Sequence, residues 1–302
     1  MLKIAMALGG GGIKGVAHIG VLKRLEQEDI QISAISGTSA GGIAGALYAS
    51  GFTADHMEDI MTNFDQSRLF SRNTEDHPAL LGIQGLVEIL HGIFLDRTFE
   101  SLRIPFACTA VDIRSGIEII LDKGKIIDAV IATSAVPGVF PPKEYNNMLL
   151  VDGGVLDPVP ITVVKKLAPG IPVVAVCLSK SAEENENFQP FRIPFDSHIP
   201  QILFDRFAQL RIARAFNIFV RSMDISSRLL TELQIQLDPP DVIIRPDVEK
   251  YSMLDKVDPK ILIEIGYSAA DEAIPQILKM FSWTDRIERQ ANKVWTSFRK
   301  SI

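Results

Sequence analysis

Ser39 lies at the centre of GTSAG (residues 37–41), which has the G-x-S-x-G spacing of a nucleophile elbow. In this arrangement a sharp turn between a strand and a helix presents the serine hydroxyl, and glycines two positions away remove side chains that would collide with it. The glycines of this region would each weaken a helix by roughly 1 kcal/mol relative to alanine. They therefore predict either close backbone packing around Ser39 or free access to its hydroxyl, whose chemistry would be nucleophilic attack.

A serine nucleophile needs a general base, and the histidines offer no good candidate. The chain has five of them: His18, His56, His77, His91 and His198. Only His198 lies late in the chain, where an α/β-hydrolase places its histidine, and it falls in a polar segment without a strand to present it. His18 lies in a predicted helix near a glycine-rich loop, where packing is the simpler interpretation.

Asp152 is the alternative base. It ends the apolar run of LLVDGGVLDPVP (residues 149–160) and precedes two glycines. A carboxylate that leaves a buried strand into a flexible turn is either a turn former, which hydrogen bonds to its own backbone, or a catalytic group. Asp157, which precedes Pro158, is the better plain turn former. Asp152 is the better base, because neighbouring apolar side chains would partly desolvate it and raise its basicity.

The glycine loop GGGGIKG (residues 9–15) lies between the first predicted strand and the first predicted helix. It fits the G-x-G-x-x-G pattern of a dinucleotide site, but the second strand ends in residues 36–37 without the acidic residue that such a site requires, and Asp29 precedes that strand. A P-loop fails because Lys14 is followed by glycine rather than Ser or Thr. What remains is a set of bare N–H groups at a helix N-terminus, which favour an anion or an oxyanion. A structural tight turn and a nucleotide-binding module are the alternatives.

The elements that must position these residues follow from apolar periodicity. Strands are predicted at residues 3–8, 32–36, 105–113, 117–122, 148–154, 172–179 and 241–246. Helices are predicted at residues 14–28, 40–50, 125–135, 161–167, 199–233, 259–281 and 284–300. Strands that alternate with helices favour a mixed, mostly parallel central sheet with helices on both faces, which is a three-layer α/β/α sandwich.

Composition limits the class of protein and its partners. Of the 302 residues, 47% are hydrophobic, and the net charge of -6 without a long basic run argues against nucleic acid as a partner. The N-terminal apolar run is too short for a signal peptide and no window approaches 18 uninterrupted apolar residues, so we expect a cytoplasmic protein without a membrane span. Cys108 and Cys177 lie in apolar runs and are predicted to be buried free thiols. We expect no metal and no other cofactor, because the sequence has no clustered ligand set.

Three motifs in order, GGGIKG (10–15), GTSAG and the DGG that begins at Asp152, resemble the patatin-like phospholipase family and in particular its bacterial members. SAVPGVFPP (134–142) and the stretches 241–255 and 263–274 resemble the same family, so the likeness extends over residues 3–281. The resemblance implies a patatin-like fold, a Ser–Asp dyad without histidine, and hydrolysis of lipid acyl esters.

Carried onto this sequence, the resemblance assigns the nucleophile, the base and the three oxyanion-hole N–H donors to Ser39, Asp152, Gly10, Gly11 and Gly12. Lys14 stands where many members have arginine, and a lysine cannot form the bidentate fork of arginine on a phosphate. The implied substrate is a lipid or another acyl ester, and a catalytically silent lipid-binding protein is the alternative. Residues 62–104 and 180–198 match no motif of the family, so the sequence leaves the acyl chain, the headgroup and the oligomeric state open.

The sequence divides into a patatin-like acyl hydrolase domain at residues 1–282 and a C-terminal amphipathic helix at residues 283–302. One face of that helix would carry its aromatic and aliphatic side chains, and the other face mostly Arg and Lys. One interpretation is a helix in the headgroup region of an anionic membrane, which would make the protein peripheral to that membrane, and the other is a terminal helix docked on the domain. The apolar segment 80–94 is a competing interfacial element, for which a lid over Ser39 is one role.

Overall fold

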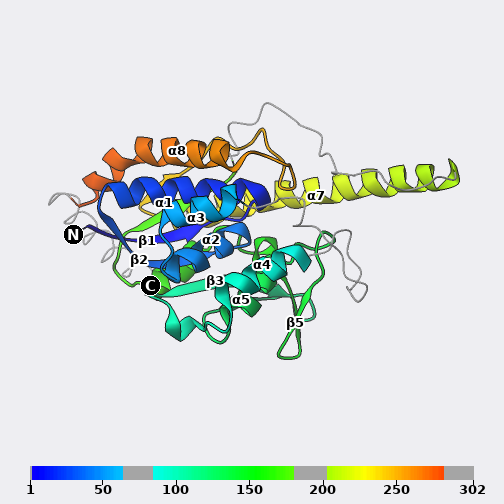
Figure 1. Ribbon diagram of the computed structural model, residues 1–302, viewed down its shortest axis with the longest axis horizontal. Coiled ribbons are helices and arrows are strands. Elements are labelled where there is room, and N and C mark those ends of the chain that lie inside the picture. The colour runs from blue at the N-terminus through cyan, green and yellow to red at the C-terminus, as the bar shows by residue number, and fades with distance from the viewer. Residues whose placement is uncertain (1, 64–83, 180–202, 282–302) are drawn as a thin grey trace, which may run out of the picture.

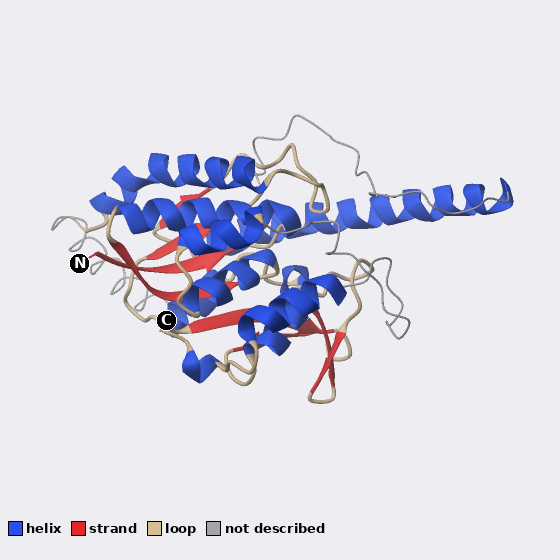
Figure 2. Cartoon of the chain, viewed as in Figure 1, coloured by secondary structure: helices blue, strands red, loops and turns tan. Residues whose placement is uncertain are grey.

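The computed structural model describes residues 2–63, 84–179 and 203–281, and for Gln84 and residues 203–217 it describes the backbone only. An eight-stranded sheet forms its centre (Figures 1 and 2). The strands are β1 (Leu2–Leu8), β2 (Ile30–Gly37), β3 (Phe106–Asp112), β4 (Ile117–Leu121), β5 (Lys143–Tyr145), β6 (Met148–Asp152), β7 (Val173–Val176) and β8 (Val242–Ile244). Their order is β5-β6-β3-β2-β1-β7-β8, with β4 paired to β3. β1, β2, β3, β7 and β8 are parallel, whereas β4 and β6 run antiparallel to β3 and β5 runs antiparallel to β6.

Helices cover both faces of this sheet. They are α1 (Ala17–Gln27), α2 (Ala40–Ala49), α3 (Ala54–Thr62), α4 (Gln84–Phe94), α5 (Ile126–Thr133), α6 (Ile161–Leu167), α7 (Leu203–Leu237) and α8 (Pro259–Lys279), together with the short 3-10 helices η1 (Gly12–Val16), η3 (Phe99–Ser101) and η4 (Gly153–Val155). The larger core cluster lies between the sheet and α1, α2, α5 and α8, and a smaller cluster lies under α6 on the other face. The predicted three-layer sandwich is confirmed. No described helix combines the length and the apolar character needed to cross a membrane.

α1 and α8 pack closely because a glycine of each helix faces the backbone of the other. A Cβ atom at Gly20 would clash with the carbonyl oxygen of Ile263, and one at Gly266 would clash with that of Ala17. On the opposite face of the sheet, small alanine side chains of β1, β2 and β7 lie in the cluster under α6. The close contact with α8 holds α1 in place, and with it the glycine loop that precedes α1.

The loops after β1 and β2 emerge side by side at the carboxyl edge of the sheet. Leu8, the last residue of β1, pairs with Gly37 of β2 on one side and with Val176 of β7 on the other. The order of the strands changes direction at β1, because β2 and β3 lie on one side of it and β7 and β8 on the other. In open α/β sheets, ligands bind at such a switch point, outside the carboxyl ends of the strands.

Among the described α-helices and strands, three were not predicted from the sequence, namely α3, α4 and β5. The predicted interfacial or lid role of residues 80–94 is wrong for the part that the structure describes, because α4 packs against α5 and its Leu90 and Phe94 side chains are fully buried in the main core. Cys108 and Cys177 are buried free thiols, as predicted. Residues 180–198, which match no motif of the family, and the predicted C-terminal helix at 283–302 lie outside the described residues.

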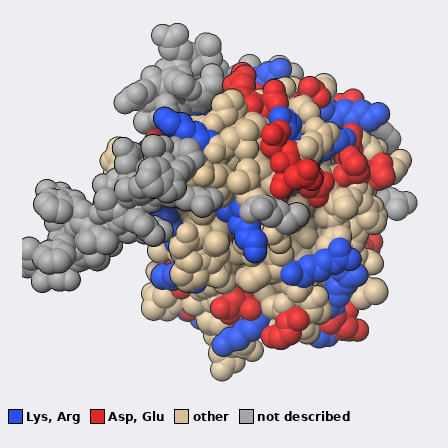
Figure 3. Space-filling view, turned by 90° about the vertical axis from the view of Figure 1, so that its left-hand side faces the viewer, with Lys and Arg blue, Asp and Glu red and all other residues tan. Residues whose placement is uncertain are grey.

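Figure 3 views the molecule from the left-hand side of Figure 1, where β1 begins, and shows acidic and basic side chains interspersed over that face. Ion pairs on α1 illustrate the balance of charge. The Lys23 ammonium lies 2.9 Å from the Asp55 carboxylate and 2.7 Å from that of Glu58, and the Arg24 guanidinium contacts Glu28 and Asp271.

Candidate active site

Ser39 occupies the sharp turn between β2 and α2 in a strained backbone conformation. Its φ is +55° and its ψ is -123°, an uncommon combination for a residue with a side chain. A Cβ atom at Gly41 would clash with the carbonyl oxygen of Leu8, so glycine is required here mainly because the backbones pack closely. The Ser39 N–H donates a hydrogen bond of 2.9 Å to Oγ1 of Thr133 on α5. The elbow that the sequence predicts is therefore present as a backbone geometry.

Thr38 anchors the elbow to later parts of the chain. Its Oγ1 lies 2.8 Å from Oγ1 of Thr109 on β3 and 2.8 Å from the carbonyl oxygen of Asp157, to which it donates. The N–H of Thr38 donates to the carbonyl oxygen of Leu8 at 3.1 Å. These buried contacts hold the turn against its neighbours, and strain of this kind persists only where the surroundings enforce it.

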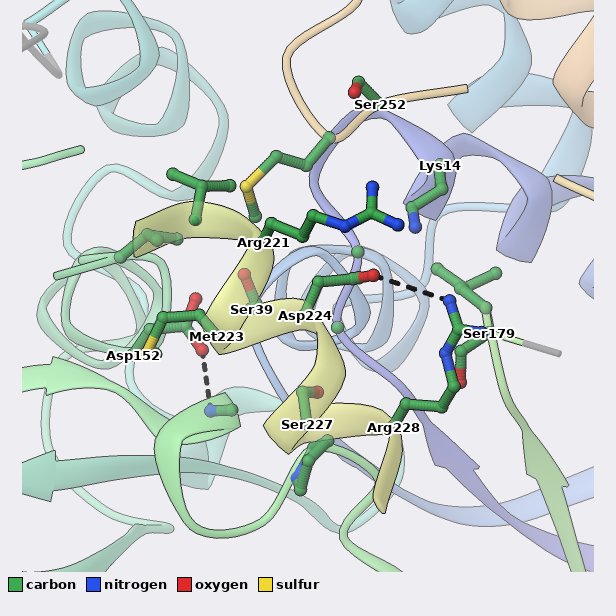
Figure 4. A pocket seen from close by; sticks show the side chains of 18 of the residues that line it. Lys14, Ser39, Asp152, Ser179, Arg221, Met223, Asp224, Ser227, Arg228 and Ser252 are labelled. Carbon is green, nitrogen blue, oxygen red and sulfur yellow. Dashed lines mark hydrogen bonds and ion pairs between the residues drawn. The ribbon is translucent and has the colours of Figure 1, made fainter. Parts of the chain in front are cut away.

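Asp152 lies at the end of β6 and faces Ser39 (Figure 4). Its Oδ1 accepts a hydrogen bond of 2.7 Å from the N–H of Gly154. Burial raises the pKa of Asp152 to about 6, whereas hydrogen bonding from the Ser39 hydroxyl and from the Gly154 N–H favours the ionised carboxylate and acts in the opposite direction. Asp152 thus forms its own turn, one of the two roles that the sequence allows, and it also lies opposite the serine (Figure 4).

The glycine loop runs directly past Ser39. A Cβ atom at Gly10 would lie 3.2 Å from the Cβ of Ser39, and the φ of +60° at Gly12 is one that favours glycine. The Gly10 N–H already donates to the carbonyl oxygen of Pro158 at 3.0 Å. Of the three N–H groups predicted to face an oxyanion, the one of Gly10 is therefore already hydrogen bonded to Pro158. Those of Gly11 and Gly12 have no hydrogen-bond partner within the described part of the chain.

His18 supports the glycine loop from α1 and does not reach the cavity. It is fully buried, and its Nε2 lies 2.8 Å from the carbonyl oxygen of Gly9. Burial lowers the pKa of His18 to about 4, so the ring is neutral at pH 7 and its Nε2–H is the donor to that carbonyl. Among the described residues no histidine lines the cavity that contains Ser39. His77 and His198 lie outside those residues.

A cavity of about 690 Å³ opens over Ser39 and Asp152. One wall is formed by α7, with lining residues between positions 218 and 231, and another by the segment 249–255. Much of the lining is apolar, including Val136, Leu178, Phe219, Met223 and Met253. The sequence predicts α7 as a helix, but no motif in it or in 249–255 indicates that these segments would enclose the site.

Charged side chains also line this cavity. Lys14 of η1 and Arg221 of α7 both extend into it (Figure 4). The Arg228 guanidinium lies 3.5 Å from the Asp224 carboxylate and 3.4 Å from that of Glu249, which ties α7 to the opposite wall. The cavity therefore combines apolar walls, two partly buried cationic side chains, and a serine and a carboxylate at its base.

A second buried carboxyl group lies beside the site. Asp157 is buried near Glu118 of β4, and the two carboxyl groups interact electrostatically. Burial, and then the neighbouring Glu118 carboxyl, raise the pKa of Asp157 to about 7. The folded protein therefore favours the protonated form of this group, because two carboxylates in contact repel each other.

We expect the substitution Asp157→Asn to make the folded state less sensitive to pH. The unfolded chain releases the Asp157 proton near its ordinary pKa of 3.8, whereas the folded chain retains it up to about 7, so stability is lost as the pH rises between these values. The asparagine has no such proton. Relative to the parent, the variant should gain about 1–3 kcal/mol in free energy of unfolding between pH 4 and pH 8. Urea unfolding at several pH values measures this difference, and parallel pH profiles of the two proteins would contradict it.

The sequence of this chain matches a known protein family. Residues 6–165 match the family model described as patatin-like phospholipase, and this match covers more than half of the chain. The chain belongs to the patatin-like phospholipase family. The glycine loop, Ser39 and Asp152 of this patatin-like chain all lie within the matched residues.

Its relatives and a structural neighbour agree with this membership. An NTE family protein of Mycobacterium tuberculosis is 32% identical over 161 residues, which are 53% of this chain and 44% of the relative. Lysophospholipase NTE1 of Meyerozyma guilliermondii is 25% identical over 292 residues, which are 89% of this chain and 19% of the relative. The patatin-like chain thus spans less than half the length of either protein. The crystal structure of VipD from Legionella pneumophila shares the fold, with a TM-score of 0.57 and 12% identity over 91% of this chain and 67% of VipD.

Proposed function

We propose that this patatin-like chain is a serine hydrolase that cleaves fatty-acyl esters of lipids, phospholipids among them. The observation that carries the proposal is the pair of residues at the base of the cavity. Ser39, presented by a strained turn, and the buried carboxylate of Asp152 both line the cavity and face each other (Figure 4). A buried carboxylate with a raised pKa is a stronger base than one in water, and it needs no histidine to accept the serine proton.

In the first half-reaction, Oγ of Ser39 attacks the ester carbonyl carbon while Asp152 takes the hydroxyl proton. The carbonyl oxygen becomes an oxyanion, which would receive hydrogen bonds from the N–H groups of Gly11 and Gly12. Such donors contribute roughly 3–4 kcal/mol each in comparable sites. The tetrahedral intermediate then breaks its bond to the alcohol, which leaves with the proton returned by Asp152, and the acyl group stays on Ser39.

In the second half-reaction, water replaces the alcohol. Asp152 takes a proton from the water molecule as its oxygen attacks the acyl carbon, and the same two N–H groups stabilise the new oxyanion. When the intermediate collapses, the proton passes from Asp152 to Oγ of Ser39 and the fatty acid is released. The enzyme returns to its starting state with no other reactant consumed.

The lining of the cavity supports a lipid substrate. Apolar side chains of α7 and of the segments around Val136 and Met253 would contact an acyl chain, whose burial is favourable by about 0.8 kcal/mol per CH₂ group. Lys14 and Arg221 would favour an ester whose headgroup carries an anion such as phosphate. The relative from Meyerozyma guilliermondii is itself named a lysophospholipase, which agrees with this class of substrate.

The test is the release of fatty acid from phospholipid vesicles, followed by mass spectrometry at a series of pH values. Because Asp152 acts as the base only when it is ionised, kcat/KM should fall about tenfold per pH unit below a pKa of about 6. The kcat/KM of a soluble short-chain ester should show the same decrease at low pH, which we call the acid limb. The reason is that the pH dependence of kcat/KM reports the ionisation of the free enzyme. If no fatty acid is released, or if the rate is constant between pH 4.5 and 7, the proposed mechanism is wrong.

A further inference from the structure

α7 exposes large apolar side chains along the part of its length whose side chains the structure describes. The exposed fractions are 69% for Ile218, 42% for Phe219, 57% for Ile225, 56% for Leu229, 44% for Leu233 and 85% for Leu237. Isolated exposed apolar residues are ordinary in soluble proteins, but a contiguous set of this size marks an interaction surface. We name these six residues the α7 stripe.

The α7 stripe lies on one side of the helix. At 100° per residue its members fall within an arc of about 120°, and they extend over about 28 Å of helix. The other residues of that arc are Ser222, Ser226 and Gln236, so it contains no charged side chain. The charged groups of this part of α7 are two basic and two acidic residues, and all four project to the same side of the arc: Arg221, Asp224, Arg228 and Glu232.

The opposite side of α7 is fixed to the domain. Val220 is buried against Val139 and Leu254, and the Arg228 guanidinium pairs with Glu249 across the cavity. Figure 1 shows the N-terminal part of α7 extending beyond the body. The helix therefore holds its apolar side outward in a defined orientation.

The α7 stripe is continuous with the cavity over Ser39. Ile218 and Phe219 belong to both, because they line the cavity and are also exposed to solvent. An apolar surface that leads directly into an apolar cavity favours a lipid bilayer as the partner that covers it. If the substrate is a lipid, its acyl chain could move from a bilayer along these side chains into the cavity without crossing water.

We propose that the α7 stripe docks on the surface of a lipid bilayer and places the cavity mouth against it. This inference rests on the proposed function for its choice of a bilayer over another apolar partner. The stripe inserts among headgroups and upper acyl chains, as the apolar side of an interfacial helix does. Because the basic and acidic residues beside it balance, binding depends on apolar contact and changes little between 0.1 M and 0.5 M salt.

The experiment compares two matched double variants of the full chain, each in an Ser39→Ala background so that the vesicles stay intact. Ile225→Gln with Leu229→Gln removes two stripe residues that do not line the cavity. Ile261→Gln with Leu278→Gln makes the same two exchanges on α8, where both side chains are exposed by 47% and 39%. Glutamine is a good helix former, so both pairs should fold. Co-sedimentation with phosphatidylcholine–phosphatidylglycerol vesicles should be weaker by about tenfold or more for the α7 pair and unchanged for the α8 pair.

A gain-of-binding variant keeps the test independent of any loss of folding. Ser222→Leu with Ser226→Leu enlarges the apolar arc and should tighten vesicle binding. Equal binding by the parent and the α7 pair would overturn the proposal. So would a parent that is dimeric by ultracentrifugation and becomes monomeric in the α7 pair with vesicle binding intact, because the stripe would then be covered by a second copy of the chain.

The outcome is separable from that of the proposed function. With Ser39 restored, the α7 pair should hydrolyse a soluble short-chain ester with unchanged kcat/KM and hydrolyse vesicle phospholipid more slowly. If the protein hydrolyses no ester but vesicle binding still depends on the α7 stripe, the proposed function fails and the docking stands. If the protein hydrolyses both substrates regardless of the α7 pair, the docking fails and the function stands.

Discussion

Ser39→Ala is expected to abolish labelling of the protein by a fluorophosphonate probe and to lower the rate of ester hydrolysis by roughly 10⁴- to 10⁶-fold. The probe reacts with an activated serine, and the substitution removes the oxygen that Asp152 is proposed to deprotonate. The backbone contact from the Ser39 N–H to Thr133 does not involve the side chain, so the turn should persist. Probe labelling followed by peptide mapping and the hydrolysis rate measure the two effects.

Ser50→Ala is the matched control. Ser50 caps the other end of α2, and its buried hydroxyl has no hydrogen-bond partner among the described residues. Its loss should leave both labelling and rate close to those of the parent. Labelling that survives in the Ser39→Ala protein would place the nucleophile on another residue, and the mechanism proposed above would have to be abandoned.

Asp152→Asn should lower kcat by roughly 10²- to 10⁴-fold while leaving the fold intact. The asparagine keeps the shape of the side chain and an oxygen that can accept from the Gly154 N–H, but it has no basic carboxylate to take the proton of Ser39. The acid limb of the pH profile should disappear together with the activity, because that limb reports the ionisation of Asp152. Single-turnover hydrolysis of a soluble ester across the pH range measures both.

His18→Gln provides the comparison that separates a dyad from a triad. His18 contacts the glycine loop through Gly9 and not Ser39, and a glutamine amide retains an N–H that can donate to the same carbonyl oxygen. Most activity should therefore remain. If this variant were as inactive as Asp152→Asn, a histidine would have to join the proton transfer.

The parts of the site that depend on local spacing could be predicted from the sequence. GTSAG defines a turn within five residues, and its position between an apolar strand and a helix is enough to indicate the elbow at Ser39. Asp152 could be selected because it follows a strand directly and because no histidine was placed to compete with it. The order of strands and helices was predictable for the same reason, since each long periodic segment carries its own signal.

The parts that depend on distant contacts could not be predicted. The Gly10 N–H is withdrawn from the oxyanion position by the carbonyl oxygen of Pro158, and nothing near either residue indicates that pairing. The same holds for the interaction between Asp157 and Glu118, which joins a turn to the antiparallel strand β4. The apolar pattern of 80–94 was misleading because a buried core helix and an interfacial helix can have the same composition, and only packing distinguishes them.

The position of β1 in the middle of the sheet has a consequence for when the protein becomes active during synthesis. β1 needs β7 as its neighbour, and Thr38 is held by Asp157, which lies 119 residues later in the chain. Non-local parallel pairings of this kind form slowly, and a growing chain exposes its N-terminal segments first. Ser39 and the glycine loop therefore leave the ribosome long before their partners do. Under the proposed mechanism, the nascent chain would carry a serine without its base, and it could not hydrolyse an ester until the sheet has closed.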